Sequence, residues 1–185
     1  PGETALTGCG ISYCAVCDGA FYEGADVAVV GGGDVALEDA LYLSNICEKV
    51  YLIHRRDGLR GAKMLQQKIK ETENIEFLPF YEVQEICGDG KVEKVILKQN
   101  QTGETRNLEL SGIFIAIGMD PQNEAAQGLV DLDATGYIVA GEDCRTSHSG
   151  IYAAGDIRTK QLRQVVTAVA DGATAISSIE QDSNC

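Results

Sequence analysis

Two cysteines separated by two residues lie near the start of the chain, in the sequence Cys14-Ala-Val-Cys17, and Asp18 follows them directly. The sulfurs of a CxxC motif can reach each other to form a disulfide, and the motif can lower the pKa of the attacking thiol. A carboxylate beside the pair can carry the proton that dithiol–disulfide exchange must move. The spacing therefore predicts a redox-active dithiol with Asp18 as its acid/base.

Structural zinc is the rival interpretation of the same cysteines. Such sites usually take four ligands, in two paired clusters. This chain has a single CxxC, with Cys9 nearby, and its only two histidines, His54 and His148, show no ligand spacing. The sequence therefore favours the dithiol over zinc and leaves the role of Cys9 open. The other cysteines are interpreted as isolated thiols: Cys47, Cys87, Cys144 and Cys185.

A glycine triplet, Gly31-Gly32-Gly33, follows a short apolar run and precedes a stretch rich in Ala, Leu and Glu that begins at Asp34. With Ala36 it matches G-x-G-x-x-A in the strand-to-helix context that a dinucleotide-binding turn requires. Glycines let the backbone approach a pyrophosphate, and the helix N-terminus offers free N–H groups and a favourable dipole. We therefore expect a bound nucleotide here rather than a plain turn.

The end of the next predicted strand indicates which nucleotide. NAD-type sites place an acidic residue about 20 positions after the glycines, where it binds the ribose 2′-hydroxyl. Here that place is taken by His54-Arg55-Arg56, and Arg60 is close by. Guanidinium groups suit a 2′-phosphate, which they bind through charge-assisted and often bidentate hydrogen bonds. The sequence therefore favours NADPH over NADH, with exposed arginines at a strand end as the alternative.

Alternating strands and helices must position these groups. Short apolar runs separated by helical stretches indicate βαβ units and a parallel sheet. Three later segments alternate between apolar and polar residues like antiparallel strands, with turn residues between them. The expected elements are strands at 26–30, 49–53 and 75–78, helices at 34–46 and 62–71, meander strands at 81–86, 91–98 and 104–110, and a strand at 113–117. The predicted class is α/β, a Rossmann-like parallel sheet with an inserted antiparallel β-meander.

The remaining segment begins with a linker at residues 118–121. Short strands are expected at 137–139 and 151–154, and a helix at 162–180. One apolar stripe runs along this helix, through Val165, Val169, Gly172, Ile176 and Ile179. Because so short a segment cannot bury a core alone, we expect a partial domain and a chain that is a piece of a longer protein.

The charge balance argues against some partners. The chain has 15 Lys and Arg against 28 Asp and Glu, so its formal net charge is −13. Such a chain repels nucleic acid and anionic membranes, and no apolar stretch approaches the 18 residues of a membrane helix. Seven of the basic residues nevertheless fall between Lys49 and Lys70. This cluster suggests a small anionic ligand, although Lys63, Lys68 and Lys70 fit a solvated helix face better.

The motifs together resemble one family, the low-molecular-weight bacterial thioredoxin reductases. The likeness rests on Cys14-Ala-Val-Cys17-Asp18-Gly19, on the glycine triplet, on His54-Arg-Arg56-Asp-Gly58, on Ile113-Phe-Ile-Ala-Ile117-Gly118 and on Gly150-Ile-Tyr-Ala-Ala-Gly155-Asp156. It covers essentially the whole chain. It implies that residues 1–118 form an NADPH-binding domain that carries the CxxC, and that residues 119–185 form the C-terminal part of an FAD-binding domain. The first FAD segment would precede Pro1.

The resemblance also implies roles. Hydride would pass from NADPH to the flavin, and electrons would then pass to the Cys14–Cys17 disulfide and on to thioredoxin. Cys17 would face the flavin, Cys14 would attack the partner's disulfide and Asp18 would be the acid/base. The residues expected along NADPH are Gly31, Gly32, Gly33, Asp34, Val35, Glu38, His54, Arg55, Arg56, Arg60, Ile117 and Gly118. Those expected along FAD are Asp156, which would bond the ribityl chain, and the 157–166 segment, with Ile157, Arg163, Gln164 and Val165.

Val35 stands where many members of the family carry Ser or Thr. The resemblance further implies a cytoplasmic homodimer with a hinge near residues 118–121. Two related enzymes remain as alternatives: the reductase component of a peroxiredoxin system, and a relative that takes its electrons from ferredoxin and has no need of the paired arginines. A non-catalytic NADP-binding module is the alternative from a different class.

Overall fold

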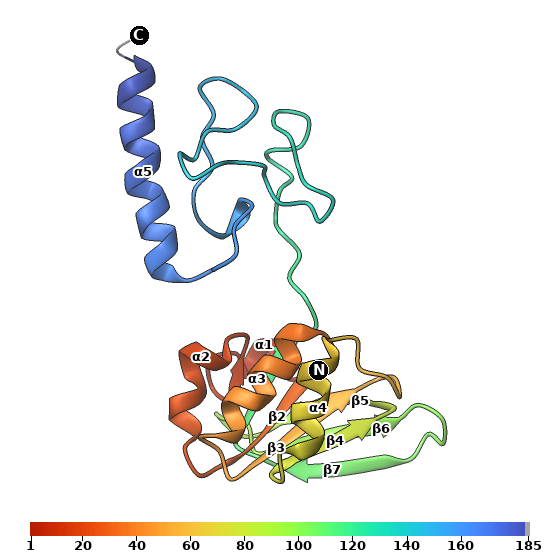
Figure 1. The fold of residues 1–185 in the computed structure, drawn as a ribbon. Coiled ribbons are helices and arrows are strands. Elements are labelled where there is room, and N and C mark those ends of the chain that lie inside the picture. The colour runs from red at the N-terminus through yellow and green to blue at the C-terminus, as the bar shows by residue number, and fades with distance from the viewer. Residues whose placement is uncertain (184–185) are drawn as a thin grey trace. The chain divides into compact units, whose positions relative to one another are not determined.

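The computed structural model describes residues 1–183. The chain forms two compact units, Pro1–Ile117 and Gly118–Cys185. Figure 1 traces both units from the N-terminus to the end of the last helix. Cys185, interpreted above as an isolated thiol, lies outside the described residues. The predicted assignment of residues 1–118 and 119–185 to two functional domains stays a prediction. No helix within residues 1–183 combines the length and the apolar character that crossing a bilayer requires.

A five-stranded parallel sheet is the centre of the first unit. Its strands stand in the order β1-β8-β2-β3-β4. Their bounds are Ile11–Ser12 for β1, Asp26–Gly31 for β2, Lys49–His54 for β3, Ile75–Pro79 for β4 and Gly112–Ala116 for β8. Because β2 pairs with β3 on one side and with β8 on the other, the ends of these three strands lie next to one another.

Alternate side chains of the central strands point to opposite faces of the sheet and pack into two separate cores. Val27 and Val29 of β2 pack with the buried side of helix α3, Asp34–Ser44, and Ala28 points to the opposite face of the sheet. Helix α3 buries Ala36, Leu37, Ala40 and Leu43, a spacing of three and four residues that places them on one helical face. Helix α4, Lys63–Glu71, packs beside α3, and Figure 1 shows both helices over the same face of the sheet.

The opposite face of the parallel sheet is covered by the predicted antiparallel meander. Its strands are β5, Tyr81–Cys87, β6, Lys94–Gln99, and β7, Thr105–Glu109, and they pair in that order. Val95 and Leu97 of β6 pack with Ile53 of the parallel sheet. The predicted α/β class, with a parallel sheet and an inserted meander, is therefore confirmed.

Several short elements near the N-terminus have no counterpart in the predictions. They are the two-residue strand β1 and three short helices: α1, Glu3–Leu6, α2, Ala15–Asp18, and the 3-10 helix η1, Gly19–Tyr22. None of them is long enough to show a period in the sequence. They nevertheless carry the CxxC motif, so they decide where the two cysteines lie.

The second unit contains one long helix, α5, Val165–Ser183, and a 3-10 turn η2, Gly155–Ile157. The strands predicted at 137–139 and 151–154 are not formed, and only isolated bridges occur there, such as Leu132 with Ile138. The predicted stripe of α5 is also not its buried side: Val165, Val169 and Ile176 are exposed, and the buried residues are Asp171, Ala175 and Ser178.

Candidate functional site

A disulfide joins the two cysteines of the CxxC motif. Cys14 and Cys17 are bonded, with their Cα atoms 5.2 Å apart. Cys14 is the N-cap of helix α2, and the backbone N–H of Cys17 donates to Cys14 Sγ over 3.2 Å. The same N–H would be available to a thiolate on Cys14 after reduction. Within residues 1–183, no group of three or more His, Cys, Asp or Glu side chains is placed to hold a metal ion.

Asp18 follows this disulfide directly in the sequence, and its carboxylate is held by a residue that the sequence did not single out. Ser12 Oγ donates to Asp18 Oδ2 over 2.6 Å and accepts the backbone N–H of Cys14 over 3.1 Å. Ser12 is only 4% exposed, whereas Asp18 is partly accessible. One buried hydroxyl therefore contacts both the first cysteine and the expected acid/base. A serine six residues before a carboxylate carries no motif, so the sequence offered little signal.

Helix α3 connects the disulfide segment to the glycine turn. Gly19, directly after α2, lies so close to α3 that a Cβ there would be 3.0 Å from Leu43 Cδ2 and 3.1 Å from Tyr42 Cε1. Ala15 of α2 is buried in the same core as α3. Because α3 begins at the glycine turn and ends against α2, the turn and the disulfide belong to one packed unit.

Each glycine of the triplet has its own surroundings. At Gly31, where φ is +158°, a Cβ would lie 2.4 Å from the carbonyl oxygen of Ala116 and 2.6 Å from the Cβ of Ala36. At Gly32 a Cβ would meet the His54 ring at 2.5 Å. At Gly33 nothing lies within 4 Å, and the backbone opens to solvent at the N-terminus of α3. The first two glycines are required by packing, while the third leaves space.

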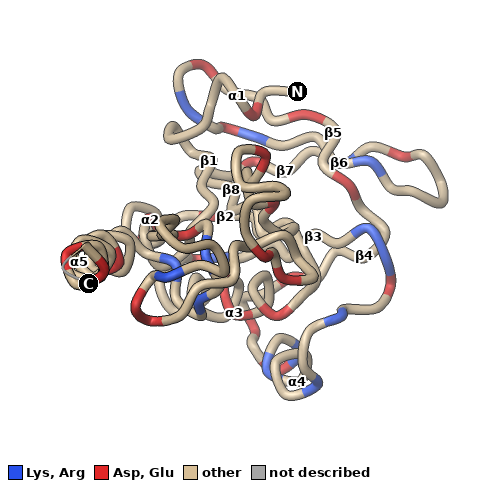
Figure 2. The backbone as a smooth tube through the Cα atoms, turned by 90° about the horizontal axis from the view of Figure 1, so that it is seen from above, with Lys and Arg blue, Asp and Glu red and all other residues tan. Residues whose placement is uncertain are grey.

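A cavity of about 520 Å³ opens at the carboxyl ends of β2, β3 and β8. Among the described residues, its lining includes six of those predicted to bind NADPH: Gly31, Gly32, His54, Arg55, Arg60 and Ile117. Ligand sites in parallel α/β sheets lie outside the carboxyl ends of the strands, so the position fits the prediction. Figure 2 marks basic positions on and beside α4, in the segment that follows β3.

His54 lines the cavity as a buried side chain with an unused polar atom. It is 6% exposed, and its Nε2 has no hydrogen-bond partner among residues 1–183. Burial lowers the pKa of His54, and the charges of Arg60, Arg56 and Arg55 lower it further. The ring is therefore neutral at pH 7, and it packs closely against Gly32 in the lining of the cavity.

The loop that follows β3 is tied to the glycine turn by backbone contacts. The N–H groups of Arg60 and Gly61 both donate to the carbonyl oxygen of Gly32, over 2.6 and 3.2 Å. Asp34 Oδ1 accepts the N–H of Ala62 over 2.7 Å. Asp34, predicted along the nucleotide, thus has a hydrogen bond within the protein. This contact fixes the end of the loop that contains Arg60, where helix α4 begins.

Other predicted residues lie outside the lining of the cavity. Val35 and Glu38 are exposed on α3, and Arg56 is exposed in the loop after β3. Gly118 has a φ of +114° and follows the last residue of the first unit. The structure thus brings the His54, Arg55 and Arg60 side chains to the cavity and leaves these others as predictions.

The predicted flavin residues all lie in the second unit. Asp156 is exposed in η2, and Ile157 packs against the small core formed around Ile138. Arg163 Nε donates to the carbonyl oxygen of Asp156 over 3.3 Å, and its guanidinium lies 4.0 Å from the centre of the Tyr137 ring.

The start of α5 carries the last two predicted flavin residues. The backbone N–H of Gln164 donates to Thr167 Oγ over 3.1 Å, which caps the first turn of the helix. Val165 is 82% exposed. The Gly155–Ile157 turn and the start of α5 are therefore well ordered by internal contacts and present an exposed carboxylate and exposed apolar side chains.

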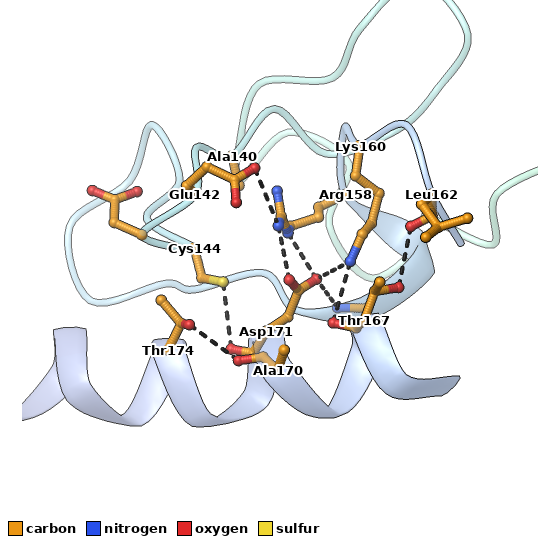
Figure 3. A network of polar contacts seen from close by, with 12 residues as sticks. Ala140, Glu142, Cys144, Arg158, Lys160, Leu162, Thr167, Ala170, Asp171 and Thr174 are labelled. Atoms are coloured by element: carbon orange, nitrogen blue, oxygen red, sulfur yellow. Dashed lines mark hydrogen bonds and ion pairs between the residues drawn. The ribbon is translucent and has the colours of Figure 1, made fainter. Parts of the chain in front are cut away.

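A buried ionic cluster fixes α5 to this turn (Figure 3). Arg158 donates two hydrogen bonds to the Asp171 carboxylate, from Nε and from Nη2, each over 2.8 Å. Lys160 Nζ and the backbone N–H of Gly155 reach the same carboxylate over 2.6 and 2.9 Å. The hydrogen bond from Arg158 is the main reason that the pKa of Asp171 is lowered. The thiol of Cys144 donates to the carbonyl oxygen of Asp171 over 3.4 Å.

Mild oxidation of the reduced chain is expected to bridge Cys14 to Cys17 and to spare Cys47. Burial raises the pKa of the Cys47 thiol to about 11, so little of the reactive thiolate forms at neutral pH. Chymotrypsin should release residues 14–21, whose only cysteines are Cys14 and Cys17, and mass spectrometry should find this peptide two hydrogen atoms lighter. A bridge that includes Cys47 instead would contradict the prediction.

A parallel sheet with a dinucleotide-type glycine turn, joined in one unit to a CxxC disulfide, defines the class of nucleotide-linked disulfide oxidoreductases. The family comparison agrees: the chain belongs to the pyridine nucleotide-disulphide oxidoreductase family, whose model matches residues 1–172.

Within this family the chain is a homologue of thioredoxin reductases. It is 46% identical over 187 aligned positions to the thioredoxin reductase of Peptoclostridium acidaminophilum, with 98% of this chain and 59% of the relative covered. It is 45% identical to the thioredoxin reductase of Bacillus subtilis (strain 168), with 97% and 57% covered. The crystal structure of thioredoxin reductase from Streptococcus pyogenes MGAS5005 superimposes with a TM-score of 0.90, at 42% identity, over 95% of this chain and 58% of that one. The chain thus spans less than two thirds of the length of these relatives.

Proposed function

We propose that the chain is the dithiol-bearing and nucleotide-binding portion of an NADPH-dependent thioredoxin reductase. The observation that carries this proposal is the Cys14–Cys17 disulfide, with Asp18 beside it, in the same packed unit as a cavity lined by His54 and Arg55. The sequence similarity to thioredoxin reductases supports it. Homodimer formation and a cytoplasmic location stay predictions.

The residues around the glycine turn fit a dinucleotide. The open space at Gly33 would accept a pyrophosphate that a side chain would block, and the N-terminal N–H groups of α3 face it. The guanidiniums of Arg55 and Arg60 would hold the adenosine end and its 2′-phosphate, with the neutral ring of His54 beside them in the lining of the cavity. NADPH, when bound, supplies a hydride.

The second unit offers residues that suit part of a flavin site. The exposed Asp156 carboxylate can accept hydrogen bonds from hydroxyl groups, and the exposed Val165 can cover an apolar ring. We assign Asp156, Ile157, Arg163, Gln164 and Val165 to FAD on this basis and on the similarity to the relatives. FAD, when bound, accepts a hydride and passes two electrons to a disulfide.

The dithiol then performs exchange with a protein disulfide. The thiolate of Cys14 attacks one sulfur of the partner, which forms a mixed disulfide and releases the partner's other sulfur as a thiolate. Cys17 attacks Cys14 of the mixed disulfide, so that the Cys14–Cys17 bond is restored and the partner leaves with both its sulfurs reduced. Two protons pass from the chain's thiols to the partner's, and we assign their movement to Asp18, which the Ser12 hydrogen bond supports.

A non-catalytic NADP-binding module is the second candidate. One observation favours it: the cavity is lined by residues of the first unit, whereas the residues assigned to FAD lie in the second. The two candidates differ in a simple property, because a chain that retains flavin is yellow after purification and a chain that binds NADPH alone is colourless.

The partner assignment predicts a covalent complex between a Cys17→Ser chain and thioredoxin. Without Cys17 the mixed disulfide cannot resolve, so Cys14 should stay attached. The probe is a thioredoxin that lacks its second active-site cysteine and carries thionitrobenzoate on the first. Release of the coloured thionitrobenzoate and a band of summed mass on a non-reducing gel measure the reaction, and mass spectrometry should place the bond within residues 14–21.

The control is the Cys14→Ser, Cys17→Ser double variant, which keeps the exposed Cys9. It should form the adduct much more slowly than the Cys17→Ser chain. Equal trapping by this control would show that an unrelated thiol reacts, and the assignment of Cys14 as the nucleophile would be lost.

A further inference from the structure

A buried hydroxyl group stands between the backbone of Cys14 and the carboxylate of Asp18. It belongs to Ser12, the last residue of β1, which pairs in parallel with Phe114 of β8. The side chain is 4% exposed, and its backbone is part of the parallel sheet. The hydroxyl is therefore fixed in position by the sheet rather than by the short helix that carries the cysteines.

The hydrogen bonds of this hydroxyl divide its donor and acceptor capacity. A serine hydroxyl has one hydrogen to donate and two lone pairs. The shortest contact, 2.6 Å, runs to Asp18 Oδ2, while the carbonyl oxygen of Cys14 is 3.3 Å away. The hydrogen is thus directed to the carboxylate, and a lone pair accepts the N–H of Cys14 over 3.1 Å. Both ends of the CxxC-Asp segment are tied to one sheet atom.

The environment of Asp18 explains why such a tie matters. Asp18 ends the four-residue helix α2 and is only half-buried, so its carboxylate has few neighbours to restrict its rotation. Tyr22 lies near enough that the Asp18 charge helps to raise the pKa of its phenol, although burial is the larger cause. General acid–base catalysis depends on holding the group within hydrogen-bond reach of the proton that it moves.

We propose that Ser12 is a positioning residue that holds the Asp18 carboxylate beside the Cys14–Cys17 pair for proton transfer during thiol–disulfide exchange. This inference rests on the proposed function, in which Asp18 moves the protons. In the exchange, the reduced pair gives two electrons and two protons to an external disulfide, its own S–S bond forms and the external S–S bond breaks. Ser12 exchanges no atom; it keeps the carboxylate in place in both redox states.

The test measures how fast the reduced chain converts oxidised glutathione to two molecules of glutathione. Asp18→Asn is expected to slow the reaction by about a hundredfold, and Ser12→Ala by about tenfold, because acid–base catalysis is worth roughly 10²–10⁴-fold and mispositioning loses part of it. Ser12→Thr retains the hydroxyl and should stay within about threefold of the parent chain. Thermal unfolding of every variant confirms that the fold is kept.

The double variant Ser12→Ala, Asp18→Asn decides whether Ser12 acts through Asp18. If it does, the double variant is as slow as Asp18→Asn alone, since there is no carboxylate left to position. Ser178→Ala, which removes a buried hydroxyl in the second unit that bonds to the carbonyl oxygen of Asp143, is the matched control and should not change the rate.

Three results would overturn the inference, and they can be told apart. An unchanged rate in Asp18→Asn removes the proton-transfer role of Asp18 and the inference with it. A second result is a double variant that is slower than Asp18→Asn by the same factor by which Ser12→Ala is slower than the parent chain. This result leaves the role of Asp18 intact but shows that Ser12 acts on the fold alone. A folded Ser12→Thr chain that is as slow as Ser12→Ala shows that the hydroxyl is not what matters.

Discussion

Replacing both Arg55 and Arg56 with alanine should weaken binding of NADPH by about a hundredfold or more while changing the affinity for NADH far less. Each charge-assisted hydrogen bond to a phosphate is worth about 1.5–3 kcal/mol, and every 1.4 kcal/mol is a factor of ten in affinity. Both arginines are exposed, so solvent screening favours the lower end of the range. NADH lacks the 2′-phosphate and therefore loses little.

The measurement is a titration of each nucleotide followed by the fluorescence of its reduced nicotinamide. Lys68→Ala, Lys70→Ala is the matched control, because it removes the same charge from exposed positions on the nearby helix α4. If this control weakened NADPH as much as the arginine pair does, the effect would come from overall charge. Equal or tighter binding of NADH by the parent chain would refute the assignment of Arg55 and Arg56.

Asp171→Ala should destabilise the second unit by about 3–5 kcal/mol, because removing one partner leaves the buried cations of Arg158 and Lys160 without their counter-charge. The side chains of the two cations are only 3% and 7% exposed, so water cannot replace the carboxylate. The backbone N–H of Gly155 loses its acceptor as well. Few other single changes in this unit remove so many buried contacts.

The same carboxylate predicts a dependence on pH. The pKa of Asp171 is lowered in the folded chain, first by the hydrogen bond from Arg158. Its contribution to stability is therefore complete above the ordinary aspartate value of about 3.9 and is lost as the pH falls below it, through the folded value. The parent chain should lose stability in that acid range, and Asp171→Ala should show a smaller further loss there.

Hydrogen exchange of peptides from α5 gives a local measure of this stability, which is needed because the chain has two compact units. Asp182→Ala is the control on the same helix. Its carboxylate pairs with Arg145 at a more exposed position, so its loss should destabilise the helix much less than the loss of Asp171. If both substitutions had equal effects on hydrogen exchange in α5, the buried cluster around Asp171 would stabilise the helix no more than the exposed ion pair of Asp182 does.

Local patterns in the sequence predicted the parallel sheet and the meander. A continuous apolar run such as residues 49–53 and an alternating run such as 81–86 each extend over five or six residues, which is long enough to recognise a strand. The strands predicted at 137–139 and 151–154 failed because three or four apolar residues have no sustained period. In addition, residues 118–183 form no strand with which these segments could pair.

The candidate site likewise contains features that the sequence predicted and features that it could not predict. The disulfide and the cavity around His54 followed from motifs whose spacing is local. Ser12 could not be found, because its partners come together only when the two-residue strand β1 joins the sheet beside β8. The bond from Asp34 to Ala62 also depends on a contact 28 residues apart, which no local pattern reveals.

The joined glycine turn and Arg60 loop have a consequence for coenzyme choice. The N–H groups of Arg60 and Gly61 donate to the carbonyl oxygen of Gly32, and the N–H of Ala62 donates to Asp34. Because of these hydrogen bonds, the Arg60 loop is already folded before a ligand binds. A nucleotide that binds at the turn would therefore find the loop backbone preorganised, and only the exposed arginine side chains would have ordering entropy left to lose. The position of this loop, and with it the preference for NADPH over NADH, would then be set when the polypeptide folds. Binding of the coenzyme would require no rearrangement of the loop backbone.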